Sequence, residues 1–227
     1  FGSEESEEVM LDVNTTLLIG LVGWWKFDEG SGTVAYDSSG NGNDGNLTNG
    51  PTWANGILGG ALNFDGIDDF VLLPATSHFD LQNFSISAWV NSSNYTHDSF
   101  IFEKTINNIG NSHYLLFFEE NSQYYSGPRL YFRTKKFGES FTHIFTASES
   151  WSNWLHVTAS FDGSNRSIFV NGTKEVSDNY SGVIASGLGR STISSSGYTF
   201  NGKIDDVRLY NNALSAEEVQ ALYNMGQ

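Results

Sequence analysis

The chain has 227 residues, and 26 acidic against 11 basic side chains give it a net charge of −15 at pH 7. This balance excludes nucleic acid and anionic membrane surfaces as partners, because both require a basic surface that releases counterions. The absence of cysteine excludes disulfides, zinc–thiolate sites and thiol nucleophiles.

Residues 1–20 differ in composition from the rest of the chain. An acidic stretch at 4–8 precedes residues 9–19, which are apolar and β-branched enough to form a strand. The longest apolar run, 17–25, is far shorter than the ~18 residues of a membrane span. We therefore treat 1–20 as an N-terminal extension and 21–227 as one domain. Segment 9–19 then has two alternatives: an extra edge strand on its own domain, or a donor strand added to the sheet of an identical subunit.

From Leu21 onward, eight Asn-Gly and Asp-Gly dipeptides mark turns, and short runs with alternating apolar residues lie between them. Only 16% of the residues are charged and 15% are aromatic, a composition that favours strands over helices. The sequence therefore predicts an all-β fold, a two-sheet antiparallel sandwich or jelly roll. The expected strands are 22–27, 69–73, 84–90, 99–104, 113–119, 129–134, 141–146, 154–161, 166–171 and 203–210.

One short helix is predicted at the C-terminus. Ser215 and Glu218 have the spacing of a capping box, and Val219 and Leu222 follow with helical periodicity. Gly226 is expected to end the helix in the left-handed conformation.

An ordered series of motifs across residues 21–225 resembles the laminin-G-like, concanavalin A-like jelly-roll domains. The motifs are Gly-Trp-Trp-Lys-Phe-Asp at 23–28, Tyr-Asp-Ser-Ser-Gly-Asn-Gly at 36–42, Asn-Phe-Asp-Gly at 63–66, Phe-Ser-Ile-Ser-Ala-Trp-Val at 84–90, Trp-Leu-His-Val at 154–157 and Lys-Ile-Asp-Asp-Val-Arg-Leu-Tyr at 203–210. The resemblance implies two curved antiparallel sheets of six or seven strands each. It also implies a non-catalytic module used for glycan binding, adhesion or protein contacts.

The loop 37–43 has the spacing of the first half of a calcium loop. Asp37, Ser39, Asn41 and Asn43 place oxygens at positions one, three, five and seven, with Gly42 at six. The same residue types also form Asx-turns. Position twelve is Thr48 instead of Glu, so the loop is not an EF-hand and further carboxylates must come from elsewhere.

We expect Asp28 and Asp205 to supply those carboxylates to a structural Ca²⁺ ion. Val207 and Leu209 share the strand face of Asp205, so this carboxylate should point toward the core and need a partner. Domains with this resemblance place the first and last strands side by side, often bridged by calcium.

Catalysis is not expected. The paired carboxylates of jelly-roll glucanases, a Glu-x-Asp-x-x-Glu spacing on one strand, do not occur, and Gly-x-Ser-x-Gly is absent. The five histidines are scattered singly, and His156 matches a strand position where a packing role is typical. The sequence therefore predicts a protein that is not an enzyme.

Aromatic residues in polar, turn-rich stretches are candidate ligand-binding residues, namely Tyr124, Tyr125 and Trp151. They can stack on sugars or simply decorate loops. Trp24, Trp25, Trp89 and Trp154 lie in predicted strands and are expected in the core.

The sequence contains about twice as many Asn-x-Ser/Thr motifs as its composition gives by chance, and this motif marks glycan acceptors only in exported chains. The lack of cysteine and the low charged fraction agree with an extracellular or cell-surface location. The candidate glycosylation sites are Asn14, Asn46, Asn83, Asn91, Asn94, Asn165, Asn171 and Asn179.

Two functions follow as hypotheses. The first is a non-catalytic, calcium-stabilised module that binds a glycan or a cell-surface protein. The second is a structural subunit of an extracellular filament or surface layer, assembled by strand addition through residues 9–19.

Overall fold

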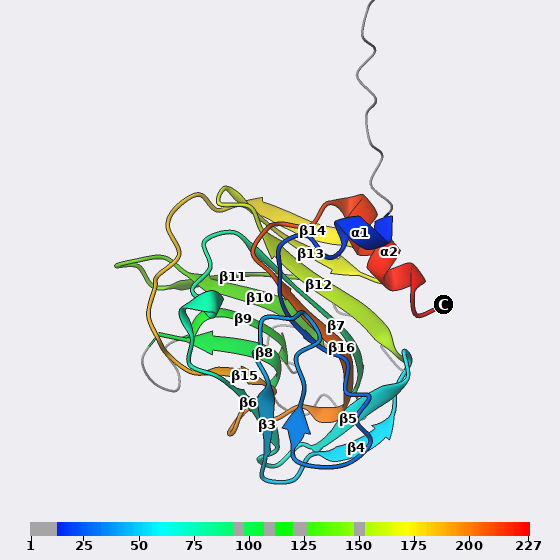
Figure 1. The fold of residues 1–227 in the computed structure, drawn as a ribbon. Helices are drawn as coiled ribbons and strands as arrows, with labels where there is room; N and C mark the ends of the chain where they lie inside the picture. The colour runs from blue at the N-terminus through cyan, green and yellow to red at the C-terminus, as the bar shows by residue number, and fades with distance from the viewer. Residues whose placement is uncertain (1–12, 93–97, 107–111, 120–126, 148–152) are drawn as a thin grey trace, which may run out of the picture.

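The computed structural model describes residues 13–92, 98–106, 112–119, 127–147 and 153–227. Within them the chain forms two antiparallel sheets of eight strands each (Figure 1). The first sheet contains β1 (Leu21–Trp25), β4 (Thr52–Asn55), β5 (Gly60–Asp65), β7 (Phe84–Ser92), β12 (Leu155–Phe161), β13 (Asn165–Val170), β14 (Thr173–Asn179) and β16 (Asn201–Tyr210). The second contains β2 (Val34–Ala35), β3 (Gly45–Thr48), β6 (Phe70–Leu73), β8 (Ser99–Thr105), β9 (Ser112–Glu119), β10 (Arg129–Lys135), β11 (Phe141–Phe145) and β15 (Ser191–Ile193).

The strand order confirms the predicted two-sheet jelly-roll sandwich. The first sheet runs β14-β13-β12-β7-β16-β5-β4, and the second runs β11-β10-β9-β8-β15-β6-β3-β2. The strand β1 lies off the main path of the first sheet and pairs with β16, so the first and last strands are neighbours as expected. Both sheets exceed the expected six or seven strands: the second sheet includes the short strands β2 and β15, and the first sheet includes β1 off its main path.

The hydrophobic core lies between the two sheets. Period-2 alternation sends every second side chain of the central strands inward, so that Ile86, Ala88 and Val90 of β7 are fully buried. Phe84 of β7 meets Tyr114 of β9 across the sandwich, with ring centroids 4.2 Å apart. This interdigitation fixes the two sheets against each other and makes the domain a rigid scaffold for its surface sites.

Two helices cover part of the outer face of the first sheet. The C-terminal helix α2 (Ala216–Asn224) has the predicted capping box between Ser215 and Glu218. Gly226 is not left-handed as predicted: the chain leaves α2 through a right-handed turn at Met225. A glycine is needed at 226 for another reason, since a Cβ atom there would lie 2.5 Å from the Trp89 ring.

The described part of the N-terminal extension forms a helical turn, α1 (Val13–Thr16), and the strand predicted over 9–19 is wrong for these residues. Leu17 is 1% exposed and packs with Leu222 of α2 and Phe169 of β13. α1 and α2 lie side by side in Figure 1. The extension therefore packs on its own domain through a helical turn; residues 9–12 lie outside the described residues. A short 3₁₀ helix, η1 (Ser77–Phe79), completes the fold.

Candidate functional site

The predicted calcium loop covers the free edge of β1. Asp37 accepts hydrogen bonds from the backbone nitrogens of Trp24 (2.9 Å), Ser39 (2.8 Å) and Asn43 (2.9 Å), and from the Ser39 hydroxyl (2.8 Å). Asn43 and Asn41 donate their side-chain amides to the carbonyl of Val22. The loop thus pairs by side chains with backbone groups that a neighbouring strand would otherwise satisfy.

These contacts test how well the loop fits a calcium ion. Each oxygen of Asp37 already accepts two hydrogen bonds, and the two asparagines present N–H groups toward Val22. Calcium needs six to eight oxygen ligands, so an ion at Asp37 would have to displace donors. The four loop residues lie together, but in an Asx-turn arrangement that does not fit the ion. Calcium therefore remains a prediction from the sequence alone.

Asp28 and Asp205 hold a different loop, residues 56–60. Asp28 accepts a hydrogen bond from the backbone nitrogen of Gly60 (2.7 Å), and Asp205 accepts from those of Ile57 and Leu58 (both 2.9 Å). Burial raises the pKa of Asp205 to about 6, and the two backbone hydrogen bonds oppose that rise. Both carboxylates therefore act as acceptors for one tight turn.

The expectation that Asp205 points toward the core with Val207 and Leu209 is wrong. A β-bulge between Asp205 and Arg208, with Asp206 at a φ of 49°, shifts the alternation of side chains by one. Asp205 instead lies opposite Trp89, whose ring stacks on Tyr223 of α2 outside the sandwich. Asp205 is fully buried because the 56–60 loop covers it.

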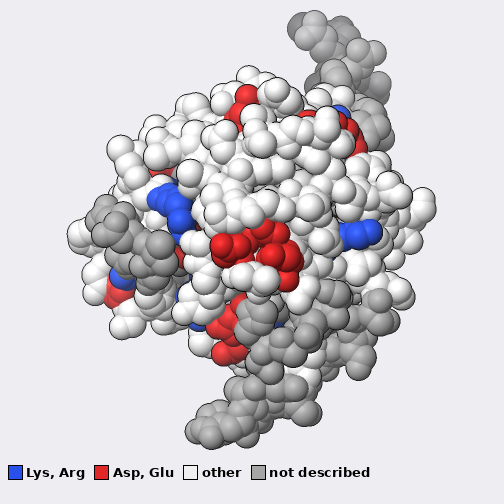
Figure 2. Space-filling model, turned by 90° about the horizontal axis from the view of Figure 1, so that it is seen from below, with Lys and Arg blue, Asp and Glu red and all other residues white. Residues whose placement is uncertain are grey.

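Another acidic group, in the turn between β5 and β6, was not predicted as a site. Ligand atoms of Asp65, Asp68 and Asp69 lie within 4.8 Å of one another, the one such group of three acidic or histidine side chains among the described residues. Burial and the neighbouring carboxylates raise the pKa of Asp69. Figure 2 shows acidic side chains gathered on the face seen from below. Three aspartates within five residues was the available signal, although exposed acidic turns are common without an ion.

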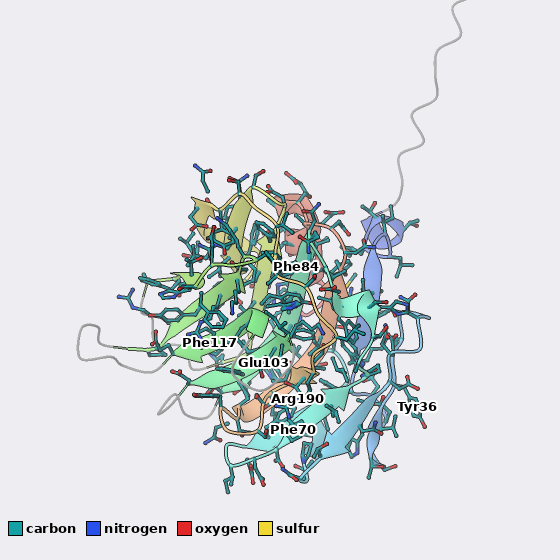
Figure 3. The ribbon with its side chains drawn as sticks, turned by 90° about the vertical axis from the view of Figure 1, so that its left-hand side faces the viewer. Tyr36, Phe70, Phe84, Glu103, Phe117 and Arg190 are labelled. Atoms are coloured by element: carbon teal, nitrogen blue, oxygen red, sulfur yellow. The ribbon has the colours of Figure 1, made fainter. Side chains whose placement is uncertain are left out.

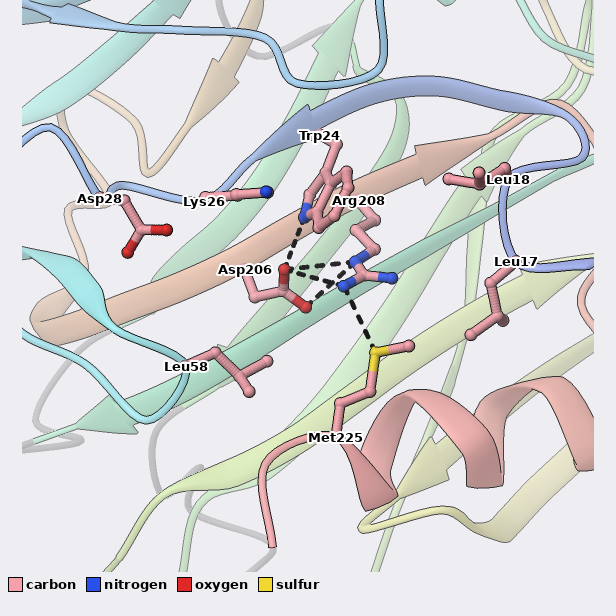
Figure 4. A pocket seen from close by; sticks show the side chains of 9 residues that line it. All are labelled: Leu17, Leu18, Trp24, Lys26, Asp28, Leu58, Asp206, Arg208 and Met225. Atoms are coloured by element: carbon pink, nitrogen blue, oxygen red, sulfur yellow. Dashed lines mark hydrogen bonds and ion pairs between the residues drawn. The ribbon is translucent and has the colours of Figure 1, made fainter. Parts of the chain in front are cut away.

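A pocket lies on the outer side of the first sheet, around Trp24 (Figure 4). It is a pocket of about 430 Å³ lined mostly by apolar side chains. In Figure 4, Leu58 stands on one side of Trp24 and Leu17 on the other. The lining residues are Leu17, Leu18, Trp24, Lys26, Asp28, Leu58, Asp206, Arg208 and Met225.

Hydrogen bonds connect Trp24, Asp206 and Arg208 at the centre of this pocket. The Trp24 indole nitrogen donates to Asp206 (2.6 Å), and Asp206 also accepts from Arg208 Nε and Nη2 at 3.2 and 3.1 Å. The guanidinium of Arg208 lies 4.3 Å and the Lys26 ammonium 4.2 Å from the Trp24 ring centroid. Burial, the largest single effect, lowers the pKa of Arg208, but the charge of Asp206 together with the charge of Tyr210 and hydrogen bonds to both outweighs it and raises the pKa. Arg208 is therefore permanently charged and already neutralised.

A hydrogen-bonded serine and histidine occur nearby but cannot act as a nucleophile and base. Ser87 Oγ lies 2.8 Å from His156 Nε2, and both residues are about 1% exposed. Burial, with a contribution from Arg208, lowers the pKa of His156 to about 3. The imidazole is enclosed by Trp89 and Tyr223, so no substrate reaches the pair. His156 packs in the fold, as its sequence position suggested.

The predicted ligand-binding residues Tyr124, Tyr125 and Trp151 lie outside the described residues. The strand ends that flank their segments are nevertheless neighbours, because Arg129 pairs with Glu119 and Tyr131 pairs with Phe145. An aromatic cluster of Phe100, Phe117 and Tyr131 lies on the outer face of the second sheet at that end. The described strand ends on either side of these segments therefore lie at the same end of one sheet.

The described candidate glycosylation sites differ in exposure. Asn46, Asn83, Asn165 and Asn179 are exposed, whereas Asn91 and Asn171 are half-buried. Asn171 accepts a hydrogen bond from the backbone nitrogen of His156 through its side-chain oxygen, Oδ1. Asn14 lies in α1, and Asn94 lies outside the described residues.

Comparison with known families identifies the fold. The family described as the concanavalin A-like lectin/glucanases superfamily matches residues 65–220 of the chain. The chain belongs to this superfamily. The laminin-G-like resemblance seen in the sequence is thereby confirmed. No match was found among curated protein sequences.

Solved structures with the same fold include domains that bind receptors and carbohydrates. The binding domain of Paraclostridial Mosquitocidal Protein 1 superposes with a TM-score of 0.72 at 18% identity, over 92% of this chain and 52% of that one. The botulinum neurotoxin serotype G binding domain gives 0.72 at 19%, over 90% and 51%. Domain 4 of AbnA, an extracellular arabinanase of Geobacillus stearothermophilus solved with arabinotriose, gives 0.67 at 21%, over 91% and 98%. This chain therefore spans about half of either toxin binding domain, and the similarity shows the fold alone.

The Trp24 pocket was not predicted, although the sequence contains a signal for it. Adjacent residues of a strand face opposite sides, so Trp24 and Trp25 cannot both lie in the core. Trp25 is fully buried, and Trp24 is half-buried on the outer side. The spacing of Asp206 and Arg208, two residues apart on a strand, also places them on one face.

No helix within the described residues is long and apolar enough to cross a bilayer.

Proposed function

We propose that this domain is a non-catalytic, extracellular binding module whose ligand, a glycan or a cell-surface protein, occupies the Trp24 pocket. The observation that carries the proposal is the pocket itself. Its volume of about 430 Å³ falls within the roughly 300–1,000 Å³ of small-molecule sites. Apolar walls with a few convergent polar groups are the usual composition of such sites.

The geometry also defines what the ligand must offer. Asp206 and Arg208 neutralise each other, so the deep part of the pocket has no net charge to be matched. Among the other lining residues, Lys26 is half-buried, Asp28 is exposed and Leu18 is 59% exposed. A ligand with an apolar surface for Leu18 and Leu58 and hydroxyl groups for Lys26 and Asp28 suits this arrangement. A sugar ring has both properties.

The comparisons support the class of function. Domain 4 of AbnA was solved with arabinotriose, and two toxin domains of the same fold are named as binding domains. A binding role in the extracellular space for this chain agrees with these relatives and with its sequons. The buried Ser87–His156 pair, inaccessible to substrate, agrees with a protein that is not an enzyme.

Calorimetric titration with a glycan panel, starting from arabinotriose, tests the proposal. Lys26→Ala and Trp24→Ala should each weaken binding by roughly tenfold or more, because each removes a ligand contact at the pocket. Trp53→Ala is the matched control: Trp53 is also half-buried in the first sheet and hydrogen-bonded through its indole, to Gly32, but lies outside the pocket.

Two outcomes would contradict the site or the function. If Tyr125→Ala or Trp151→Ala abolishes binding while Lys26→Ala and Trp24→Ala do not, the ligand binds through Tyr125 or Trp151 and not in the Trp24 pocket. If no glycan and no extracellular protein of the panel binds saturably, the binding module is rejected. The filament hypothesis has no support from the described part of the segment, because α1 contacts α2 and Leu17 packs on its own domain.

A further inference from the structure

A second pocket lies on the second sheet, away from the Trp24 pocket. It has a volume of about 310 Å³ and is formed by β3, by β6 with the residues that follow it, and by the residue before β15. Its lining comprises Asp44, Asn46, Leu72, Leu73, Pro74, Ala75 and Arg190. Figure 3 shows Arg190 next to Phe70 on this sheet.

The Arg190 side chain has neither an ion pair nor a hydrogen bond within the described residues, and two of its nitrogens are buried in that state. Its Nε and Nη2 atoms are closed off from solvent without an acceptor, which leaves Nη1 as the open nitrogen. Arg166 and Arg208, by contrast, each pair with an aspartate. A guanidinium without an acceptor is costly in a partly buried place, so a ligand that brings an acceptor gains binding energy there.

The backbone holds Arg190 in place. Its carbonyl oxygen accepts from the backbone nitrogen of Thr105 (2.8 Å) and from the Thr105 hydroxyl (3.1 Å). Its guanidinium carbon lies 5.3 Å from the Phe70 ring centroid, a cation–π contact. The preceding Gly189 admits no side chain, since a Cβ atom would meet the Thr105 carbonyl at 2.1 Å. The cation is therefore positioned before any ligand arrives.

The other groups of the pocket limit the ligand. Asp44 accepts a hydrogen bond from the backbone nitrogen of Asp37 through Oδ1, so its carboxylate is fixed and Oδ2 remains an acceptor. A bare small anion is repelled by Asp44, whereas a hydroxyl group can donate to it. Asn46 both donates and accepts, and Leu72 and Pro74 supply an apolar wall.

We propose that this pocket binds an acidic sugar, with the sugar carboxylate on Arg190 and ring hydroxyls on Asp44 and Asn46. The carboxylate supplies the counter-ion that Arg190 lacks and accepts a charge-assisted hydrogen bond from the open Nη1. The CH face of the ring packs on Leu72 and Pro74. This site goes beyond the proposed function and is independent of it, because it shares no residue with the Trp24 pocket.

The test compares two sugars that differ only at carbon six: methyl β-D-glucuronide and methyl β-D-glucoside. Protein from a host without N-glycosylation is used, because Asn46 is itself a candidate glycan acceptor. Titration is followed by calorimetry or by NMR. The glucuronide should bind at least roughly tenfold more tightly than the glucoside, since only it forms the charge-assisted hydrogen bond.

Variants connect the preference to Arg190. Arg190→Gln should abolish the difference between the two sugars, and Asp44→Asn should weaken both. Arg133→Gln is the matched control, since Arg133 is a half-buried arginine on the same sheet with its guanidinium over Phe117. That control should leave the preference unchanged.

Four results would overturn the proposal. They are equal binding of the two sugars, failure of both to bind, an Arg190→Gln protein that keeps the preference while folded, and acetate binding as tightly as the glucuronide. The last would show a simple carboxylate site without recognition of the sugar. A Trp24→Ala protein that still binds the glucuronide would separate this site from the Trp24 pocket.

Discussion

Two arginines on the two sheets of the sandwich differ in whether a carboxylate neutralises them. Arg208 is 4% exposed and shares hydrogen bonds with Asp206, which is 5% exposed, inside the Trp24 pocket. Arg190 is half-buried in the pocket of the second sheet and has no counter-ion among the described residues. Both stand over an aromatic ring. A pocket whose charged side chains neutralise each other therefore selects its ligand by shape. A pocket that contains an unpaired charge selects its ligand by charge.

The largest expected effect comes from breaking the pair in the Trp24 pocket. Asp206→Ala should lower the free energy of unfolding by about 3–5 kcal/mol, because it leaves the Arg208 guanidinium buried without a partner. Urea denaturation measures this. Asp68→Ala, an exposed aspartate, is the control and should change stability little. A loss under about 1 kcal/mol for Asp206→Ala would mean that the pair is not what keeps the pocket intact.

A second effect concerns the loop that forms one wall of the Trp24 pocket. Burial raises the pKa of Asp205 from 3.8 to about 6, so the folded state binds a proton that the unfolded state has released between these values. The stability contributed by this group is therefore highest below pH 4 and falls as the pH rises to about 6. The loss is of the order of 2–3 kcal/mol.

The Asp205→Asn protein isolates this effect. An amide keeps an oxygen for Ile57 and Leu58 but cannot ionise. The variant should match the wild type near pH 4 and exceed its stability at pH 7, as measured by denaturation across that range. A difference that stays constant between pH 4 and 7 would contradict the raised pKa.

The fold was largely predictable from sequence because strand periodicity is a local signal. Segments 84–90 and 155–161 alternate clearly, and the sheets contain β7 and β12 there. Strands such as β14 and β15 were missed, because β14 has a mostly exposed polar sequence and β15 has only three residues. These strands form because they pair with neighbouring strands in the folded sheet, and a short stretch of sequence does not contain that information.

The candidate sites were harder to predict, and the reasons are physical. The loop 37–43 has residue types that suit both calcium and Asx-turns, and only the hydrogen bonds to β1 distinguish these uses. The bulge at Asp206 reversed the face expected for Asp205. Arg190 lies in a glycine-rich stretch with no motif, and its lack of a partner is a property of the folded structure. The spacing of residues along a strand predicts which side chains share a face of the sheet. It does not predict which charged side chains remain unpaired in the folded protein.

An intermediate effect on stability is expected at the edge of β1, the strand that contains Trp24. Asp37→Ala should cost about 1–3 kcal/mol, since the backbone nitrogen of Trp24 and its neighbours lose their acceptor. Excess EDTA should leave the melting temperature of the wild type unchanged, because hydrogen bonds already satisfy the loop. A melting temperature that falls with EDTA in the wild type but not in Asp37→Asn would support the calcium prediction instead.

The smallest effect on stability is expected at Arg190. Its guanidinium forms no ion pair or hydrogen bond with the described residues, so Arg190→Gln should change the free energy of unfolding by less than about 0.5 kcal/mol. The same substitution should remove the preference for an acidic sugar. Function and stability are thus expected to separate at Arg190, whereas at Asp206 and Arg208 they are coupled. If Arg190→Gln instead destabilises the domain as strongly as Asp206→Ala, the guanidinium serves the fold, and the contrast between the two pockets is lost.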